Sequence, residues 1–182
     1  FNSIGTYGNL KLFNYLASKA GPKLRYVLYK TNEAGYNIFT NAAAIGNMQL
    51  MQRALEVGAK PGVESSQEEA IASVAIVNGQ IDILEYLVTQ RHCDLKKLFE
   101  AEDGSFWSLT PTEHSPLVKA ALAGHFEVVK YFIENLNLDE TAVREKFPGD
   151  LLLTAVRGNN IALVEYLLPF YGGAEALVTH CY

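Results

Sequence analysis

A short apolar segment, a glycine and a second apolar segment recur along the chain, and this repetition constrains the fold more than any other feature. In the clearest copy, residues 116–122 and 126–133 carry apolar side chains at helical spacing, and Gly124 lies between them. Glycine adopts most cheaply the left-handed conformation in which many helices end. Two helices this short are only marginally stable alone, so the pattern predicts copies that stack on one another.

Five copies can be aligned on the residue at the break, which we call the hinge. The hinges are Gly8, Gly46, Gly79, Gly124 and Asn159. Asparagine is the next residue most tolerant of a left-handed conformation, so its presence at the last hinge fits the pattern. The repetition predicts an all-α fold built from helix-turn-helix repeats, with almost no β-sheet.

The copy around Gly124 resembles the ankyrin repeat. Ser115-Pro116-Leu117 stands where that family usually has Thr-Pro-Leu, and residues 120–125, Ala-Ala-Leu-Ala-Gly-His, match the family before its outer helix. The family's usual His is Val118 here, and the Thr position of the other copies is degenerate, being occupied by Asn37, Ala70 and Asp150. The resemblance covers residues 8–168 and implies an ankyrin-like α-solenoid; an unrelated helical array would also form a solenoid.

We expect a single ankyrin-repeat domain over residues 1–182. Its parts are a partial first repeat (1–30), repeats at 31–66 and 67–90, a long insert (91–113), a repeat at 114–147, and a repeat with a C-terminal cap (148–182). Extra short helices are expected at residues 23–29 and 138–147, where an ordinary ankyrin repeat has a loop. The chain begins with Phe rather than Met, which favours a fragment of a longer protein.

The outer helices are expected to supply much of the core. Leu84 and Val129 are predicted to be buried in two of these helices. Tyrosines recur at one position of the outer helices, at Tyr15, Tyr86, Tyr131 and Tyr166. We expect this column to be structural, with each ring packed sideways and its hydroxyl at the solvent edge.

Composition and charge narrow the function. The net charge of −5 argues against a nucleic-acid partner held by phosphate contacts. No apolar run is long enough for a transmembrane helix. The two His-Cys dipeptides, at 92–93 and 180–181, lack the spacing of a zinc site, so we expect no metal or cofactor and two reduced thiols in a cytoplasmic protein.

No catalytic motif is found, so we expect a protein that is not itself an enzyme. Two alternatives stay open. The chain could be the substrate-targeting or localisation domain of a larger enzyme, as in effectors that intracellular bacteria deliver into the host cytosol. It could also be a thiol enzyme that uses Cys93 or Cys181, although no partner His is suitably spaced.

The resemblance implies a monomeric module that binds a protein or peptide through its inner-helix face and inter-repeat loops. The candidate partner-binding residues are Tyr36, Asn41, Ile45, Val74, Asn78, Phe106, Trp107, His114, Lys119, Leu122, Thr154 and Arg157. Most lie on inner-helix positions that point away from the outer helices, and this strip is mostly neutral and partly apolar, which suits a protein partner.

Phe106 and Trp107 lie within the insert, in a segment that alternates like a strand. Neighbours in a strand point to opposite faces, so one ring would pack inward and the other would face a partner. The alternative is that residues 91–114 fold back as a cover and bury both rings.

Overall fold

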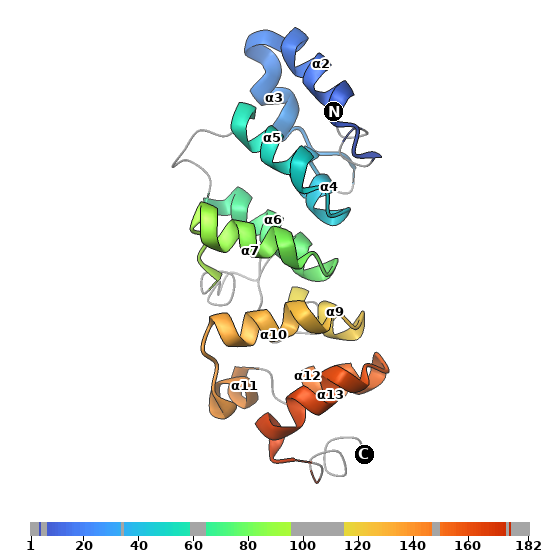
Figure 1. Ribbon diagram of the computed structural model, residues 1–182, viewed down its shortest axis with the longest axis vertical. Helices are drawn as coiled ribbons and strands as arrows, with labels where there is room; N and C mark the ends of the chain where they lie inside the picture. The colour runs from blue at the N-terminus through green and yellow to red at the C-terminus, as the bar shows by residue number, and fades with distance from the viewer. Residues whose placement is uncertain are drawn as a thin grey trace. The chain divides into compact units, whose positions relative to one another are not determined.

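The chain is entirely helical wherever its structure has regular secondary elements. The computed structural model describes residues 4, 7–33, 35–58, 65–95, 115–146, 150–173 and 175, and these ranges contain helices and turns but no strand. The all-α class is therefore confirmed. The helices form two compact units, Phe1–Cys93 and Asp94–Tyr182, shown as ribbons in Figure 1. The boundary falls inside the predicted insert, of which residues 96–113 lie outside the described ranges; a single domain over 1–182 stays a prediction.

The first unit contains two complete helix pairs and a shorter N-terminal part. Its elements are α2 (Leu10–Ala20), the 3-10 helix η1 (Gly21–Lys23), α3 (Leu24–Tyr29), α4 (Ile38–Ala44), α5 (Met48–Gly58), α6 (Ser65–Val77) and α7 (Ile81–Arg91). Helix α4 packs on α5 and α6 packs on α7, while the two inner helices α4 and α6 also pack on each other. Helices α2 and α3 both contact α5 (Figure 1).

The second unit repeats this arrangement. Its elements are α9 (Pro116–Leu122), α10 (Phe126–Asn135), α11 (Glu140–Lys146), α12 (Asp150–Arg157), α13 (Ile161–Leu167) and the 3-10 helix η2 (Leu168–Tyr171). The pairs are α9 with α10 and α12 with α13, and the inner helices α9 and α12 pack on each other. The expected extra helices are present as α3 with η1 and as α11. The predicted C-terminal cap lies largely outside the described residues.

All five hinges adopt the left-handed conformation that the sequence predicts. The φ angles are 68° at Gly8, 72° at Gly46, 71° at Gly79, 81° at Gly124 and 52° at Asn159. The last four hinges are closed by one recurring backbone bond, in which the residue after the hinge donates its N–H to the carbonyl five residues earlier. Its N–O distances are 2.9 Å at Asn47, Gln80 and His125, and 3.1 Å at Asn160. This bond satisfies a carbonyl that the helix end would otherwise leave unpaired.

The residue after the hinge also joins neighbouring repeats. Asn160 accepts a bond from the N–H of Leu163, which caps α13, and its Nδ2 donates to the carbonyl of Gly124 at 2.8 Å. Asn47 makes the same two contacts, capping α5 through Leu50 and donating to the carbonyl of Gly8 at 3.1 Å. One side chain thus caps the start of the outer helix in its own repeat and bonds to the hinge of the preceding repeat, which keeps the two repeats in register.

Two inner helices, α4 and α9, begin at capped positions, as their sequences indicate. Asn37 Oδ1 accepts the N–H groups of Phe39 and Thr40, while Thr40 Oγ1 accepts the N–H of Asn37, which completes a capping box. Ser115 caps α9 by accepting the N–H of Val118, and Pro116 occupies the first helical position, where its missing N–H costs nothing.

Each unit has its own apolar core between its helices. Phe13 and Phe39 are fully buried in the first unit, and Phe132 in the second. Leu84 on α7 and Val129 on α10 are also fully buried, which confirms the expectation for both.

Candidate functional site

The second unit exposes a short strip of side chains where two inner helices end side by side. We call Lys119, Leu122 and Arg157 the α9–α12 strip. Leu122 is 51% exposed and Val156 is 39% exposed, while Arg157 is exposed and Lys119 half-buried. Val156 lies about 200° round α12 from Gly158, so it faces away from α9 and is left out of the strip. Lys119 lies one turn before Leu122 on α9, and Arg157 is the equivalent of Leu122 on α12, so the strip combines an exposed leucine with two cations. Mixed surfaces of this kind are used for recognition between proteins.

A close backbone contact brings the two halves of this strip together. A Cβ atom placed on Gly158 would lie 2.5 Å from the carbonyl oxygen of Leu122 and 3.1 Å from that of Ala121. The end of α12 therefore rests directly on the end of α9, with no room for a side chain between them. This contact brings the backbone at Gly158, the residue after Arg157, close to the backbone at Leu122.

Two of the partner-binding residues predicted from the sequence, Val74 and Thr154, are not at the surface. Val74 on α6 is only 3% exposed and Thr154 on α12 only 7%. Both lie five residues before their hinge, a position that the sequence places on the open face. Asn41 and Lys119, at the same position of their repeats, are half-buried, so this position is fully covered only on α6 and α12. Neither Val74 nor Thr154 offers surface to a partner.

The other inner-helix candidates are partly exposed. Ile45, at the end of α4, is 45% exposed. Asn78 is half-buried, and its Nδ2 donates to the carbonyl of Val74 in its own helix at 2.9 Å. Asn41 is half-buried, and its Nδ2 is buried with no hydrogen-bond partner among the described residues. A buried donor left in this state is costly, and because this Nδ2 atom is buried it offers no accessible hydrogen-bonding group to a partner.

The candidates outside the inner helices fall into two groups. Tyr36 is half-buried in the loop before α4, where its N–H donates to Asn32 Oδ1 at 2.9 Å and its carbonyl accepts the N–H of Asn32 at 2.8 Å. Phe106, Trp107 and His114 lie outside the described residues. The prediction that the insert takes part in binding therefore stays a prediction.

A shallow groove in the first unit was not anticipated from the sequence. It has a volume of about 490 Å³ and is lined by Tyr7, Gly8, Ile45, Gly46, Asn47, Met48 and Gln49. Tyr7 is 84% exposed and, like Ile45, stands one residue before its hinge. The alignment of hinges is the signal that could have paired these two apolar side chains.

The exposure of Val156 on α12 was also not predicted from the sequence. The equivalents of Val156 three residues before Gly46, Gly79 and Gly124 are Ala43, Ile76 and Ala121, and these three are fully buried. Periodicity therefore predicts a core residue. Only the packing of the last helix pair shows that this position is open there.

A reactive cysteine and a metal-binding cluster are the two kinds of chemical site to consider among the described residues. Cys93 is 8% exposed, so a nucleophilic thiol at this position would be shielded from a substrate. Within the described ranges, no three His, Cys, Asp or Glu side chains gather closely enough to hold a metal ion. Cys181 lies outside those ranges.

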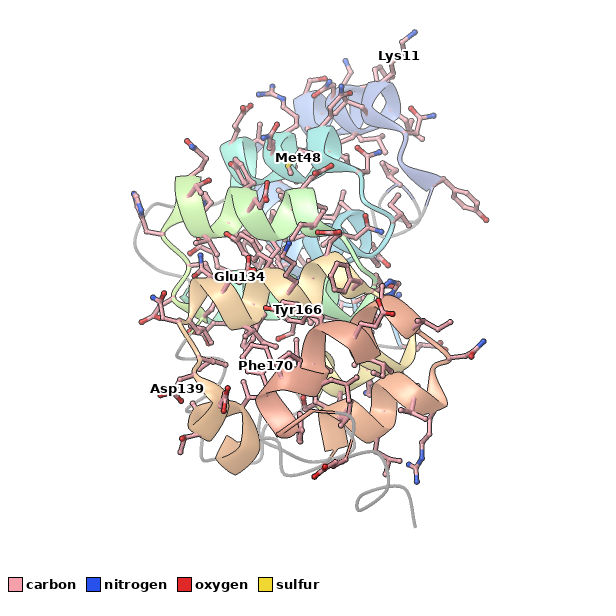
Figure 2. The ribbon with its side chains drawn as sticks, turned by 60° about the horizontal axis from the view of Figure 1, so that its bottom comes forward. Lys11, Met48, Glu134, Asp139, Tyr166 and Phe170 are labelled. Atoms are coloured by element: carbon pink, nitrogen blue, oxygen red, sulfur yellow. The ribbon has the colours of Figure 1, made fainter. Side chains whose placement is uncertain are left out.

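Tyr166, a member of the predicted tyrosine column, is the centre of an aromatic cluster that joins α10, α13 and η2. Its ring meets Phe126 edge-on with centroids 5.7 Å apart, and Phe170 at 5.6 Å. Figure 2 labels Tyr166 and Phe170 together with Glu134 of α10. Burial raises the pKa of the Tyr166 hydroxyl above its usual value near 10.0, and the Glu134 carboxylate raises that pKa further.

This pKa shift predicts a loss of stability in alkaline solution. The folded protein holds the Tyr166 proton more tightly than the unfolded chain does. The contribution of this group to the free energy of unfolding is therefore fully present below the unfolded pKa near 10.0 and is lost as the pH rises through the folded pKa. In a phenolate titration followed near 295 nm, the absorbance that the Tyr166→Phe variant lacks should have a midpoint above 10.0. Glu134→Gln should lower this midpoint; a midpoint at or below the usual value in the parent would contradict the assignment.

Comparison with known proteins does not assign the chain to a family. No protein-family model matches its sequence, and none of the curated proteins does. Among the helices of the described ranges, none combines the length and the apolar character needed to span a lipid bilayer.

Proposed function

We propose that this chain is an ankyrin-like repeat array that binds a partner protein or peptide through its inner-helix face and has no catalytic role of its own. The observation that carries the proposal is the α9–α12 strip, where Leu122 is 51% exposed on the same inner-helix face as Lys119 and at the position that Arg157 occupies in the next repeat. An apolar centre flanked by cations offers both buried area and directional contacts to a protein surface. The stacked helix pairs and the left-handed hinges support the ankyrin-like interpretation.

The test uses Leu122→Asp, because a charge at the centre of the strip opposes burial of an apolar partner group. Ile161→Asp is the matched control: Ile161 is 70% exposed, but it lies on the outer helix α13. The full chain and both variants serve as baits in cell extract, and bound proteins are compared by mass spectrometry.

We expect proteins that the parent captures to be lost with Leu122→Asp and retained with Ile161→Asp. The melting temperatures of both variants should stay within a few degrees of the parent, because both side chains are exposed. Equal capture by the parent and the Leu122 variant would show that the strip is not the binding surface.

A further inference from the structure

The positive charge of this protein is concentrated at one end of its sequence. Residues 1–30 hold five of the 15 Lys and Arg residues and none of the 20 Asp and Glu residues. Residues 31–182 therefore carry ten cations against 20 anions, a formal charge of −10, although the whole chain has −5. A basic segment within an acidic protein creates a local field of the opposite sign to that of the remainder.

Helix α2 presents part of this charge on one face. Lys11, Tyr15 and Lys19 are spaced by four residues, which places them in one row along the helix, and all three are exposed. Lys19 Nζ lies 5.9 Å from the centre of the Tyr15 ring, in the range of a cation–π contact. Lys11 extends outward from α2 in Figure 2.

The covered side of α2 is a different one. Phe13 is fully buried, and Asn14 Oδ1 accepts a 3.0 Å bond from Arg53 Nε of α5. The row of Lys11, Tyr15 and Lys19 is therefore the side of α2 that packing within the first unit leaves open.

The segment after α2 continues this composition. Lys23 in η1 is exposed, and Tyr26 in α3 is 74% exposed, while Leu28 on the same short helix is fully buried. Tyr15 and Tyr26 are among the most exposed large apolar side chains of the described residues, at 60% and 74%. We call the row of Lys11, Tyr15 and Lys19 on α2 the basic–aromatic surface.

We propose that the basic–aromatic surface binds a short acidic peptide segment of a partner protein, at a site separate from the α9–α12 strip. Charge complementarity identifies the partner's chemistry: Lys11 and Lys19 attract carboxylates, and the exposed ring of Tyr15 between them offers flat apolar area for a side chain between those carboxylates. Helix α2, with 11 residues, is about 16 Å long, which an extended peptide of roughly five residues spans.

The charge of the remainder favours a short peptide over a larger polyanion. A nucleic acid or an anionic membrane extends well beyond the patch and would also meet the rest of the first unit, where residues 31–93 carry seven Asp and Glu against three Lys and Arg, a formal charge of −4. A short peptide meets only the local positive field.

The experiment measures fluorescence anisotropy of a labelled peptide, about ten residues long, made of Glu and Asp with two Leu, titrated with the full chain. A peptide in which Gln and Asn replace the acids is the neutral control. The key variant is Lys19→Glu. Its matched control is Lys130→Glu on α10, because Lys130 Nζ also lies 5.9 Å from an aromatic ring, that of Phe126, and the net charge changes equally.

We expect saturable binding of the acidic peptide only. Lys19→Glu should weaken binding about five- to tenfold, Lys130→Glu less than about twofold, and Tyr15→Ala about threefold. Raising the salt from about 50 to about 200 mM should weaken the parent's binding, because the contacts are exposed. Lys11→Glu, outside the cation–π pair, repeats the test if Lys19→Glu lowers the melting temperature.

Several outcomes would overturn the proposal. They are an absence of saturable binding, equal effects of Lys19→Glu and Lys130→Glu, and equal binding of the neutral peptide. Tighter binding of a single-stranded oligonucleotide or of vesicles containing phosphatidylserine through the same lysines would assign the surface to another class of partner. Self-association that Lys19→Glu abolishes would assign it to a second copy of the chain. If the acidic peptide does not bind but proteins are still captured by the parent and lost with Leu122→Asp, the proposal for α2 fails while the proposed function of the α9–α12 strip stands.

Discussion

Truncation of Leu84 to alanine is expected to lower the free energy of unfolding by about 2–4 kcal/mol, because a fully buried leucine leaves a cavity that its neighbours fill only partly. Val129→Ala should also be destabilising in the second unit, by a smaller amount, since fewer atoms are removed. Chemical denaturation of the full chain, followed by far-UV circular dichroism, measures both losses.

Glu85→Ala is the control for Leu84→Ala, because Glu85 is the next residue of α7 and is exposed. Its effect should stay within about 0.5 kcal/mol. If Leu84→Ala and Glu85→Ala had similar small effects, the face of α7 that packs inward would be assigned wrongly.

Gly158→Ala is expected to destabilise the protein by about 1–3 kcal/mol, through overpacking where α12 rests on α9. The added Cβ would lie 2.5 Å from the carbonyl oxygen of Leu122, and backbone cannot move aside as a flexible side chain can. Gly158 is not among the glycines with positive φ, so alanine could adopt its backbone conformation. A glycine replaced in that way ordinarily stabilises a protein by about 0.4–1 kcal/mol, so the contact should reverse the sign.

Gly173→Ala serves to separate the effect of overpacking from the effect of backbone strain. Gly173 has a φ of 88°, but a Cβ there would meet nothing within 4 Å. It should therefore show backbone strain alone, about 1 kcal/mol. A Gly158→Ala variant more stable than the parent, in urea denaturation, would mean that α9 and α12 do not approach as closely as described.

The helix pairs could be predicted because their signals are local. The hinges require a left-handed residue, and only glycine and asparagine supply one cheaply, so Gly46 and Asn159 mark equivalent turns without knowledge of any contact. The cap at Asn37 depends on its own side chain and on residues within the next turn. The buried faces of the outer helices follow from apolar spacing, as Leu84 and Val129 show.

The candidate surface could be predicted only in part. Leu122 and Arg157 are exposed at the ends of their helices, as the alignment predicts. Val74 and Thr154 are buried, whereas Val156 is exposed although Ala43, Ile76 and Ala121 at the equivalent position are buried. Burial at these positions depends on the neighbouring helix, which comes from a distant part of the sequence.

The sequence by itself therefore determined the helical class, the hinges and the helix boundaries near them, since each depends on φ preference, capping or periodicity within a few residues. The tertiary structure decided which inner-helix side chains reach solvent, that Gly158 must stay small, and that α2 leaves Lys11, Tyr15 and Lys19 uncovered. The physical reason is that accessibility and close approach are properties of pairs of helices, and the sequence of one helix does not contain the shape of its neighbour.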